Sequence, residues 1–253
     1  MGYNLEMDYD KINAMREGGK IMAQIFRDLR EYTKVGMTGR QISDWVEKQI
    51  LDAGAGVAYY EPEVDFPGSI CVSVNDELIH GIPKDIPFEE GDKISYDLVI
   101  KYKGYYVDSA FTMVLGKPTA AQKHLLSYTE SSLYEGIEQV KPGAKLGDIG
   151  FAVQKTLEKG KLGVIKNYVG HGIGKKMHME PEVPNYGKKG HGYTLQVGDT
   201  ICIEPMSSLG KPDTVVVEDD DGWAVCLKDG SLGCHFEHTV LVTEDGYEII
   251  TTL

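Results

Sequence analysis

The sequence has no apolar run that approaches the roughly 20 residues of a membrane-spanning helix, and its N-terminus lacks the apolar segment of a secretory signal peptide. Basic residues are few, since 26 Lys and Arg stand against 39 Asp and Glu for a net charge of −13. This balance argues against nucleic acid or an anionic membrane as the main partner. The four cysteines, Cys71, Cys202, Cys226 and Cys234, show no C-x-x-C spacing. They fit reduced thiols, so we expect a cytoplasmic protein.

One short pattern occurs twice. The segments 91–97 and 198–204 both begin Gly-Asp and end in an acidic residue, and a constant offset of 107 residues relates them. Read as strands, the copies place Asp97 and Glu204 in mid-strand, opposite an apolar face. A buried carboxylate is costly unless it is paired, protonated or bound to a cation. The duplication therefore predicts one domain over 1–253 with halves at about 1–117 and 118–253 and a shared site between them.

Apolar periodicity and capping signals predict two helices in each half, followed by strands. The first helix is expected over 9–32, and the Thr38-x-x-Gln41 pattern predicts a capped start for the second. Thr119-x-x-Gln122 predicts the start of a third helix, and a fourth follows it. Both halves thus have the order helix, helix, strands.

A hairpin is expected at the end of the first half. Two strands joined by a Lys103-Gly104 turn would make Asp97 a diagonal same-face neighbour of Asp108. At roughly 7–8 Å between backbones, two such carboxylates can converge on one ion. The alternative is a solvent-exposed hairpin with ordinary surface acids, but residues 94–100 are too apolar to favour it.

Histidines and a further acid mark the second half. A glycine-punctuated segment carries His171 and His178, at a spacing that does not suit one helical face. A single histidine is more often structural than a ligand, but two beside an acidic site favour a functional role. A strand over 233–242 is expected to hold Glu237 in its interior, on the same face as His235.

These motifs resemble those of the type I methionine aminopeptidases, over nearly the whole chain. The motifs are Ser73-Val74-Asn75-Asp76 through His80-Gly81-Ile82-Pro83, Gly170-His171-Gly172-Ile173-Gly174, Met177-His178 with Glu180-Pro181, Ile203-Glu204-Pro205-Met206, and Glu237-His238-Thr239. The resemblance implies the α+β pita-bread fold, with pseudo-twofold halves around a central antiparallel sheet. It implies a hydrolase that removes the N-terminal methionine from nascent proteins and peptides when the second residue is small. The start at Met1, without a zinc-finger extension, suggests a bacterial form.

The resemblance also implies roles for individual residues. It gives the ligands of two divalent metal ions as Asp97, Asp108, His171, Glu204 and Glu237. Oxygen-rich ligation with one imidazole suits Co, Mn, Fe or Zn and does not select among them. The resemblance also gives three catalytic groups. Glu204 would handle the proton of water, and His178 and His80 would contact the substrate. The resemblance gives the lining of a narrow apolar pocket as Phe66, Cys71, Met177 and Trp223.

Four positions depart from the family pattern. Two residues before a strand ligand, where Asn, His, Thr and Gln are expected, stand Ser95, Tyr106, Cys202 and His235. By strand alternation each shares a face with a ligand, so we expect them to contact the ligands from behind. The thiol of Cys202 would favour softer ions such as Zn, although a buried thiol also packs well as a small hydrophobe. The departures suggest a divergent paralogue.

Two other interpretations use the same fold. A Pro-specific aminopeptidase or prolidase would carry an extra N-terminal domain, and a first helix at residue 9 begins too early for one. A non-catalytic module that contacts RNA would have lost ligands and gained basic tails. For the enzyme we expect a monomer that acts on nascent polypeptide or peptide substrates. A transient ribosome contact would use clustered lysines, which are otherwise an ordinary solvated face: Lys155, Lys159, Lys161, Lys166, Lys175, Lys176, Lys188 and Lys189.

Overall fold

The computed structural model describes residues 8–62, 64–216 and 222–253. Its four α-helices in those ranges are α1 (Tyr9–Tyr32), α2 (Gly39–Asp52), α3 (Ala120–Ile137) and α4 (Leu146–Lys159), with a short 3-10 helix, η1, at Ala58–Tyr60. The predicted capping boxes are confirmed, because the hydroxyls of Thr38 and Thr119 accept hydrogen bonds from the backbone amides of Gln41 and Gln122. None of the described helices is both long and apolar enough to cross a membrane.

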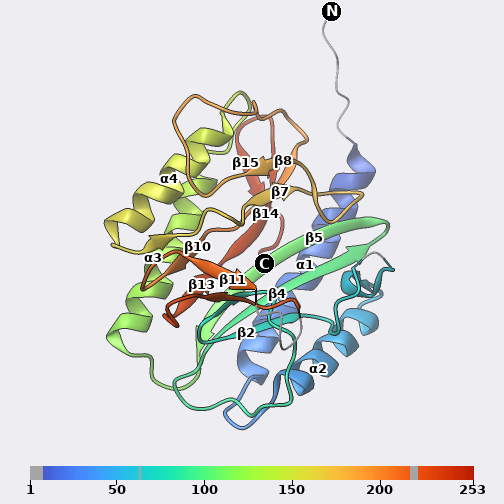
Figure 1. The fold of residues 1–253 in the computed structure, drawn as a ribbon. Coiled ribbons are helices and arrows are strands. Elements are labelled where there is room, and N and C mark those ends of the chain that lie inside the picture. Colours follow the sequence, from blue (N-terminus) through green and yellow to red (C-terminus); the bar gives the residue numbers. More distant parts are fainter. Residues whose placement is uncertain (1–7, 63, 217–221) are drawn as a thin grey trace, which may run out of the picture.

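A nine-stranded antiparallel sheet forms the centre of the molecule (Figure 1). Its strands are β1 (Gly56–Val57), β2 (Cys71–Val74), β4 (Lys93–Tyr102), β5 (Tyr105–Val114), β7 (Gly170–Gly172), β8 (Met179–Val183), β9 (Thr200–Ile203), β14 (Glu237–Val242) and β15 (Tyr247–Ile249). The order is β1-β4-β5-β14-β9-β7-β8, with β2 on β4 and β15 on β14. The hairpin of the first half thus lies beside the β14–β9 pair of the second.

Two small sheets flank the large one. One has the order β13 (Gly233–His235), β10 (Met206–Ser208), β6 (Gly163–Val164), and the other the order β11 (Thr214–Val216), β12 (Val225–Leu227), β3 (Glu77–Ile79). In Figure 1, α1 crosses behind β4 and β5, with α2 on one side and α3 and α4 on the other. The apolar faces of these helices and the sheet form one continuous buried core. The opposite side of the sheet is left for the site.

The predicted hairpin is confirmed, and its register is the expected one. Lys103 and Gly104 both have positive φ, as a two-residue turn requires. Val99 lies opposite Asp108, which makes Asp97 and Asp108 diagonal neighbours on one face.

Contrary to the prediction, Glu204 and Glu237 do not lie in the interior of a strand. β9 ends at Ile203, so Glu204 follows the strand, and Glu237 opens β14 after a break at Phe236. The strand expected over 233–242 is therefore two strands, β13 and β14. At Glu204 the chain passes from the large sheet to the β13-β10-β6 sheet, and at Glu237 it passes back into the large sheet. Pro205, which has no amide hydrogen, cannot continue the β9 ladder. Both carboxylates thus stand at corners between two sheets.

Candidate active site and metal centre

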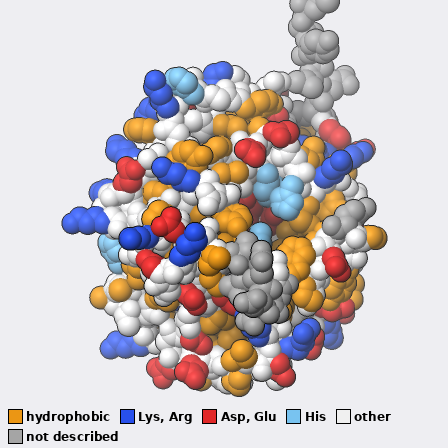
Figure 2. Space-filling view, viewed as in Figure 1, with side chains coloured by type: hydrophobic (Ala, Val, Ile, Leu, Met, Phe, Trp, Pro, Cys, Tyr) orange, Lys and Arg blue, Asp and Glu red, His pale blue; other side chains and the backbone are white. Residues whose placement is uncertain are grey.

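All eleven residues that the sequence singled out for the site line one small pocket. Its volume is about 130 Å³, and Tyr59, Val64 and Val99 complete its lining. Figure 2 shows this side of the molecule, where histidine side chains lie at the edge of a hollow with acidic side chains inside it. The eleven residues are Phe66, Cys71, His80, Asp97, Asp108, His171, Met177, His178, Glu204, Trp223 and Glu237.

The register of the sheet brings the carboxylates together. Ala110 in β5 lies opposite Asp97 in β4 and also opposite Glu237 in β14. Directly opposed residues of neighbouring strands share a face of the sheet, so the two carboxylates flank a single methyl group. Asp108 joins them from the same strand as Ala110, and its amide donates a 3.1 Å hydrogen bond to the hydroxyl oxygen of Thr239 in β14.

His171 completes this cluster from β7. Glycine on both sides of it is required by close packing, because a Cβ on Gly170 would lie 2.1 Å from the carbonyl oxygen of Cys202, and one on Gly172 would lie 2.3 Å from that of Glu180. The Nδ1 of His171 is 2.9 Å from the carbonyl oxygen of Gly172. An Nδ1–H donor there leaves the lone pair of Nε2 pointing toward the carboxylates, as a metal-binding imidazole requires.

The separations in the cluster fit shared ligation better than hydrogen bonding. The Nε2 of His171 lies 3.6 Å from Oδ2 of Asp108 and 3.6 Å from Oε1 of Glu204. These distances exceed those of a good hydrogen bond. Two buried carboxylate oxygens, Oδ1 of Asp108 and Oε1 of Glu237, have no hydrogen-bond partner in the described part of the chain. Unpartnered buried oxygens are costly, and a cation satisfies them.

The pKa values of the clustered residues also favour a bound cation. Burial, and then the charges of Asp108 and Glu204, raise the pKa of both Asp97 and Glu237 well above the ordinary range. Removal from water also raises the pKa of Glu204 to about 8. Burial alone would lower the pKa of His171, but the neighbouring carboxylates outweigh it and raise the value to about 9. The buried carboxylates thus crowd like charges together, and a divalent cation would neutralise them. The oxygen and imidazole donors therefore fit divalent metal ions.

His80 and His178 stand beside this cluster without belonging to it. The rings of His178 and His171 meet edge to face, with centroids 4.5 Å apart. Burial lowers the pKa of both His80 and His178, and each also feels the charge of a neighbouring histidine. Both are therefore neutral imidazoles near pH 7, and each has one N–H to donate.

The rest of the pocket is an apolar wall. The rings of Phe66 and Trp223 pack edge to face at 5.4 Å, and Cys71 and Met177 continue the lining. Tyr59, in η1, was not singled out by the sequence analysis. Its buried ring packs on Phe66 at 5.1 Å, and its hydroxyl donates a 3.3 Å hydrogen bond to Oδ1 of Asp97. The apolar wall and the carboxylate cluster are thus directly joined.

The four departures from the family pattern differ in what they contact. The hydroxyls of Ser95 and Thr112 are 2.8 Å apart, and Thr112 donates to the carbonyl oxygen of His235, so Ser95 supports the strand that precedes Glu237. The Tyr106 side chain makes no hydrogen bond to a ligand among the described residues, and its hydroxyl donates instead to Glu61 at 2.7 Å.

Cys202 and His235 do lie at the cluster. One ligand atom from each of Asp108, His171, Cys202 and Glu237 lies within 4.8 Å of the other three. Burial raises the pKa of the Cys202 thiol well above its usual range, so this thiol keeps its proton until a cation displaces it. Burial lowers the pKa of His235 to about 3, so its imidazole is neutral.

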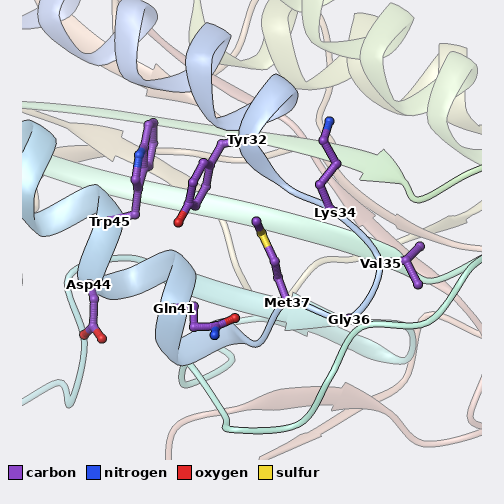
Figure 3. Close-up of a pocket in the computed structure, with 8 residues that line it drawn as sticks. All are labelled: Tyr32, Lys34, Val35, Gly36, Met37, Gln41, Asp44 and Trp45. Atoms are coloured by element: carbon purple, nitrogen blue, oxygen red, sulfur yellow. The ribbon is translucent and has the colours of Figure 1, made fainter.

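A larger hollow of about 700 Å³ lies elsewhere, between the end of α1 and the start of α2. Figure 3 shows the rings of Tyr32 and Trp45 facing each other there, stacked at 4.6 Å, with Met37 pointing toward them. Its charged side chains are Lys34 and Asp44, and it contains no histidine. Size alone would favour this hollow, but the chemistry lies in the small pocket.

Comparison with known proteins gives a consistent result. Residues 13–244 match the model of metallopeptidase family M24. Methionine aminopeptidase 1 of Bacillus subtilis (strain 168) is 39% identical over 241 residues, which cover 95% of this chain and 96% of the relative. The crystal structure of methionine aminopeptidase from Rickettsia prowazekii superimposes with a TM-score of 0.93 at 37% identity, covering 97% of this chain and 99% of that one.

A prolidase from Pyrococcus furiosus shares the fold alone. Its TM-score is 0.75 at 22% identity, and the match covers 96% of this chain but 64% of the prolidase. Neither the prolidase alternative nor the non-catalytic module is favoured by these matches. The predicted α+β pita-bread fold and the predicted class of metal-dependent hydrolase are confirmed. The chain belongs to the methionine aminopeptidases of metallopeptidase family M24.

Proposed function

We propose that this enzyme removes the N-terminal methionine from nascent proteins and peptides whose second residue is small. One observation carries the proposal: an apolar, aromatic wall borders directly on the carboxylate and imidazole cluster inside a pocket of about 130 Å³. Methionine is unbranched and makes favourable sulfur contacts with aromatic rings such as those of Phe66 and Trp223. So small a pocket leaves little room beside that side chain, in keeping with a small second residue.

The five clustered residues would hold two divalent ions: Asp97, Asp108, His171, Glu204 and Glu237. Such ions lower the pKa of water and polarise a peptide carbonyl. Glu204 would take the proton of the attacking water and return it to the leaving amine. Its carboxylate stands at the end of β9 with its side chain 12% exposed, where water can reach it.

The neutral imidazoles of His178 and His80 would donate hydrogen bonds as the peptide bond breaks. An N–H aimed at the developing oxyanion stabilises the transition state more than the substrate. The apolar wall, with Cys71 and Met177 beside the two rings, would hold the methionine side chain and exclude water from the reacting bond.

We further propose a cytoplasmic monomer in which residues 1–117 and 118–253 are related halves of one domain. The pairing of β5 with β14 joins the two halves at the site, which supports this division. A transient ribosome contact through the clustered lysines is part of the proposal, and all eight lysines are exposed. If co-sedimentation with ribosomes is unchanged after reversal of four of these charges, the contact is absent.

A peptide series tests the proposed activity. The metal-loaded enzyme should release methionine from Met-Ala-Ser, act poorly on Met-Leu-Ser and Leu-Ala-Ser, and leave Ala-Pro intact. Free amino acids are measured by chromatography at equal enzyme concentration. Hydrolysis of Ala-Pro without release of methionine from Met-Ala-Ser would contradict the proposal and favour the prolidase alternative.

A further inference from the structure

The imidazole of His235 is buried, and its residue is 1% exposed. Among the described residues, neither of its ring nitrogens has a hydrogen-bond partner. Its Nε2 lies 3.6 Å from Oε2 of Glu204 and 4.0 Å from Oε2 of Glu237. A buried polar group in this state is costly, and both distances are too long for a hydrogen bond. They are, however, separations found between two ligands of one cation.

His171 shows the same relationship to the cluster. Its Nε2 is 3.6 Å from Oδ2 of Asp108 and 3.6 Å from Oε1 of Glu204. Glu204 therefore lies between two imidazoles, with one carboxylate oxygen toward each. His171 is a ligand in the proposed centre, and His235 has the same kind of position on the other side of Glu204.

Cys202 adds a sulfur to the same cluster. Its residue is 0% exposed, and its Sγ is one of four donor atoms that lie within 4.8 Å of one another. It pairs with Thr239 across the β9–β14 ladder, and its sulfur is 3.6 Å from the Thr239 hydroxyl. The sheet thus holds the thiol on the face that carries the carboxylates.

We propose that His235 and Cys202 are additional ligands of the metal centre, which therefore prefers softer divalent ions, zinc above all, to manganese. This rests on the proposed metal centre and adds a second imidazole and a thiol to it. Nitrogen and sulfur donors shift preference toward zinc, whereas carboxylates and water suit manganese. Binding to the thiol displaces its proton, so uptake of zinc releases a proton that Cys202→Thr cannot release.

Cobalt spectroscopy tests the sulfur ligand. Metal-free enzyme is titrated with Co²⁺, and a sulfur-to-cobalt charge-transfer band is expected in the near ultraviolet. Cys202→Thr and Cys202→Ser should both lose the band. Two variants are used so that the test still holds if one of them fails to fold. Cys234→Thr is the matched control, since it removes a buried thiol that is outside the cluster, and it should keep the band. A wild-type protein that binds Co²⁺ without the band would overturn the assignment of Cys202.

The second imidazole is tested by proton NMR of the Co²⁺ protein. Two hyperfine-shifted ring N–H signals are expected in the wild type, from His171 and His235, and one in His235→Gln. In competition between equimolar Zn²⁺ and Mn²⁺, the bound ratio should fall by about tenfold or more in Cys202→Thr and His235→Gln. An unchanged ratio and one signal in both proteins would overturn the inference. Failure of the wild type to bind any metal would instead contradict the proposed function.

Discussion

The ammonium group of Lys93 donates a 2.8 Å hydrogen bond to the carbonyl oxygen of Glu77, in a position that is 0% exposed to solvent. It also donates to the carbonyl oxygen of Ser73 at 3.3 Å. No carboxylate oxygen among the described residues lies within 4.0 Å of it. A buried cation without an ion pair is costly, and burial lowers the pKa of Lys93 to about 8.

Lys93 should give the stability of the protein a measurable pH dependence. Between about pH 8 and 10.5 an unfolded lysine binds a proton that the folded one has lost, so the free energy of unfolding rises with pH. Across that window the free energy of unfolding of the wild type should rise, relative to that of Lys93→Met, by on the order of 3 kcal/mol. Urea unfolding at several pH values measures it, and the comparison cancels the titration of other groups. Parallel pH curves for the two proteins would contradict this.

Tyr59 should tune the metal centre through its hydrogen bond to Asp97. Tyr59→Phe keeps the ring against Phe66 and removes only the hydroxyl, so metal affinity should fall by roughly 10–100-fold. Titration calorimetry on the metal-free protein measures this. Tyr60→Phe is the control, because Tyr60 is 53% exposed and its hydroxyl donates to Glu47 instead. Equal metal affinities for Tyr59→Phe and the wild type would show that the hydroxyl does not influence the metal centre.

His178 and Glu204 should separate catalysis from binding. His178→Ala should keep its metal content but lose on the order of 10²–10³ in kcat, as expected for a lost oxyanion donor. Glu204→Gln should cost far more in kcat than in substrate binding, because the amide cannot move the proton. Steady-state kinetics and elemental analysis of each variant check this. A His178→Ala protein without metal would mean that His178 is a ligand.

Local signals in the sequence were enough for the helices and the β4–β5 hairpin, because capping residues and a Lys-Gly turn act within a few residues. The duplication and the hairpin already pointed to Asp97, Asp108 and Glu204, but the full set of eleven site residues required the family resemblance. Asp97 and Glu237, for example, meet only through the pairing of β4, β5 and β14. Pro205 indicates from the sequence that the strand ends near Glu204. The prediction followed the alternation of side chains instead and placed Glu204 in mid-strand.

Tyr59 and Lys93 could not be predicted in the same way. A tyrosine in a short segment such as η1 does not reveal whether its ring turns inward, and a lysine at the start of a strand is normally exposed. Their roles depend on packing between segments far apart in the chain. Tyr59 meets Asp97 across 38 positions, and Lys93 meets Ser73 across 20.

The central claim is that the carboxylate and imidazole cluster binds the ions on which methionine release depends. Its most direct test is the rate of methionine release from Met-Ala-Ser by chelator-treated enzyme, before and after refilling with Mn, Co, Fe or Zn singly. The treated enzyme should be inactive and regain activity with at least one ion, and Asp97→Ala and His171→Ala should lose metal and rate together. Full activity in metal-free protein would contradict the claim.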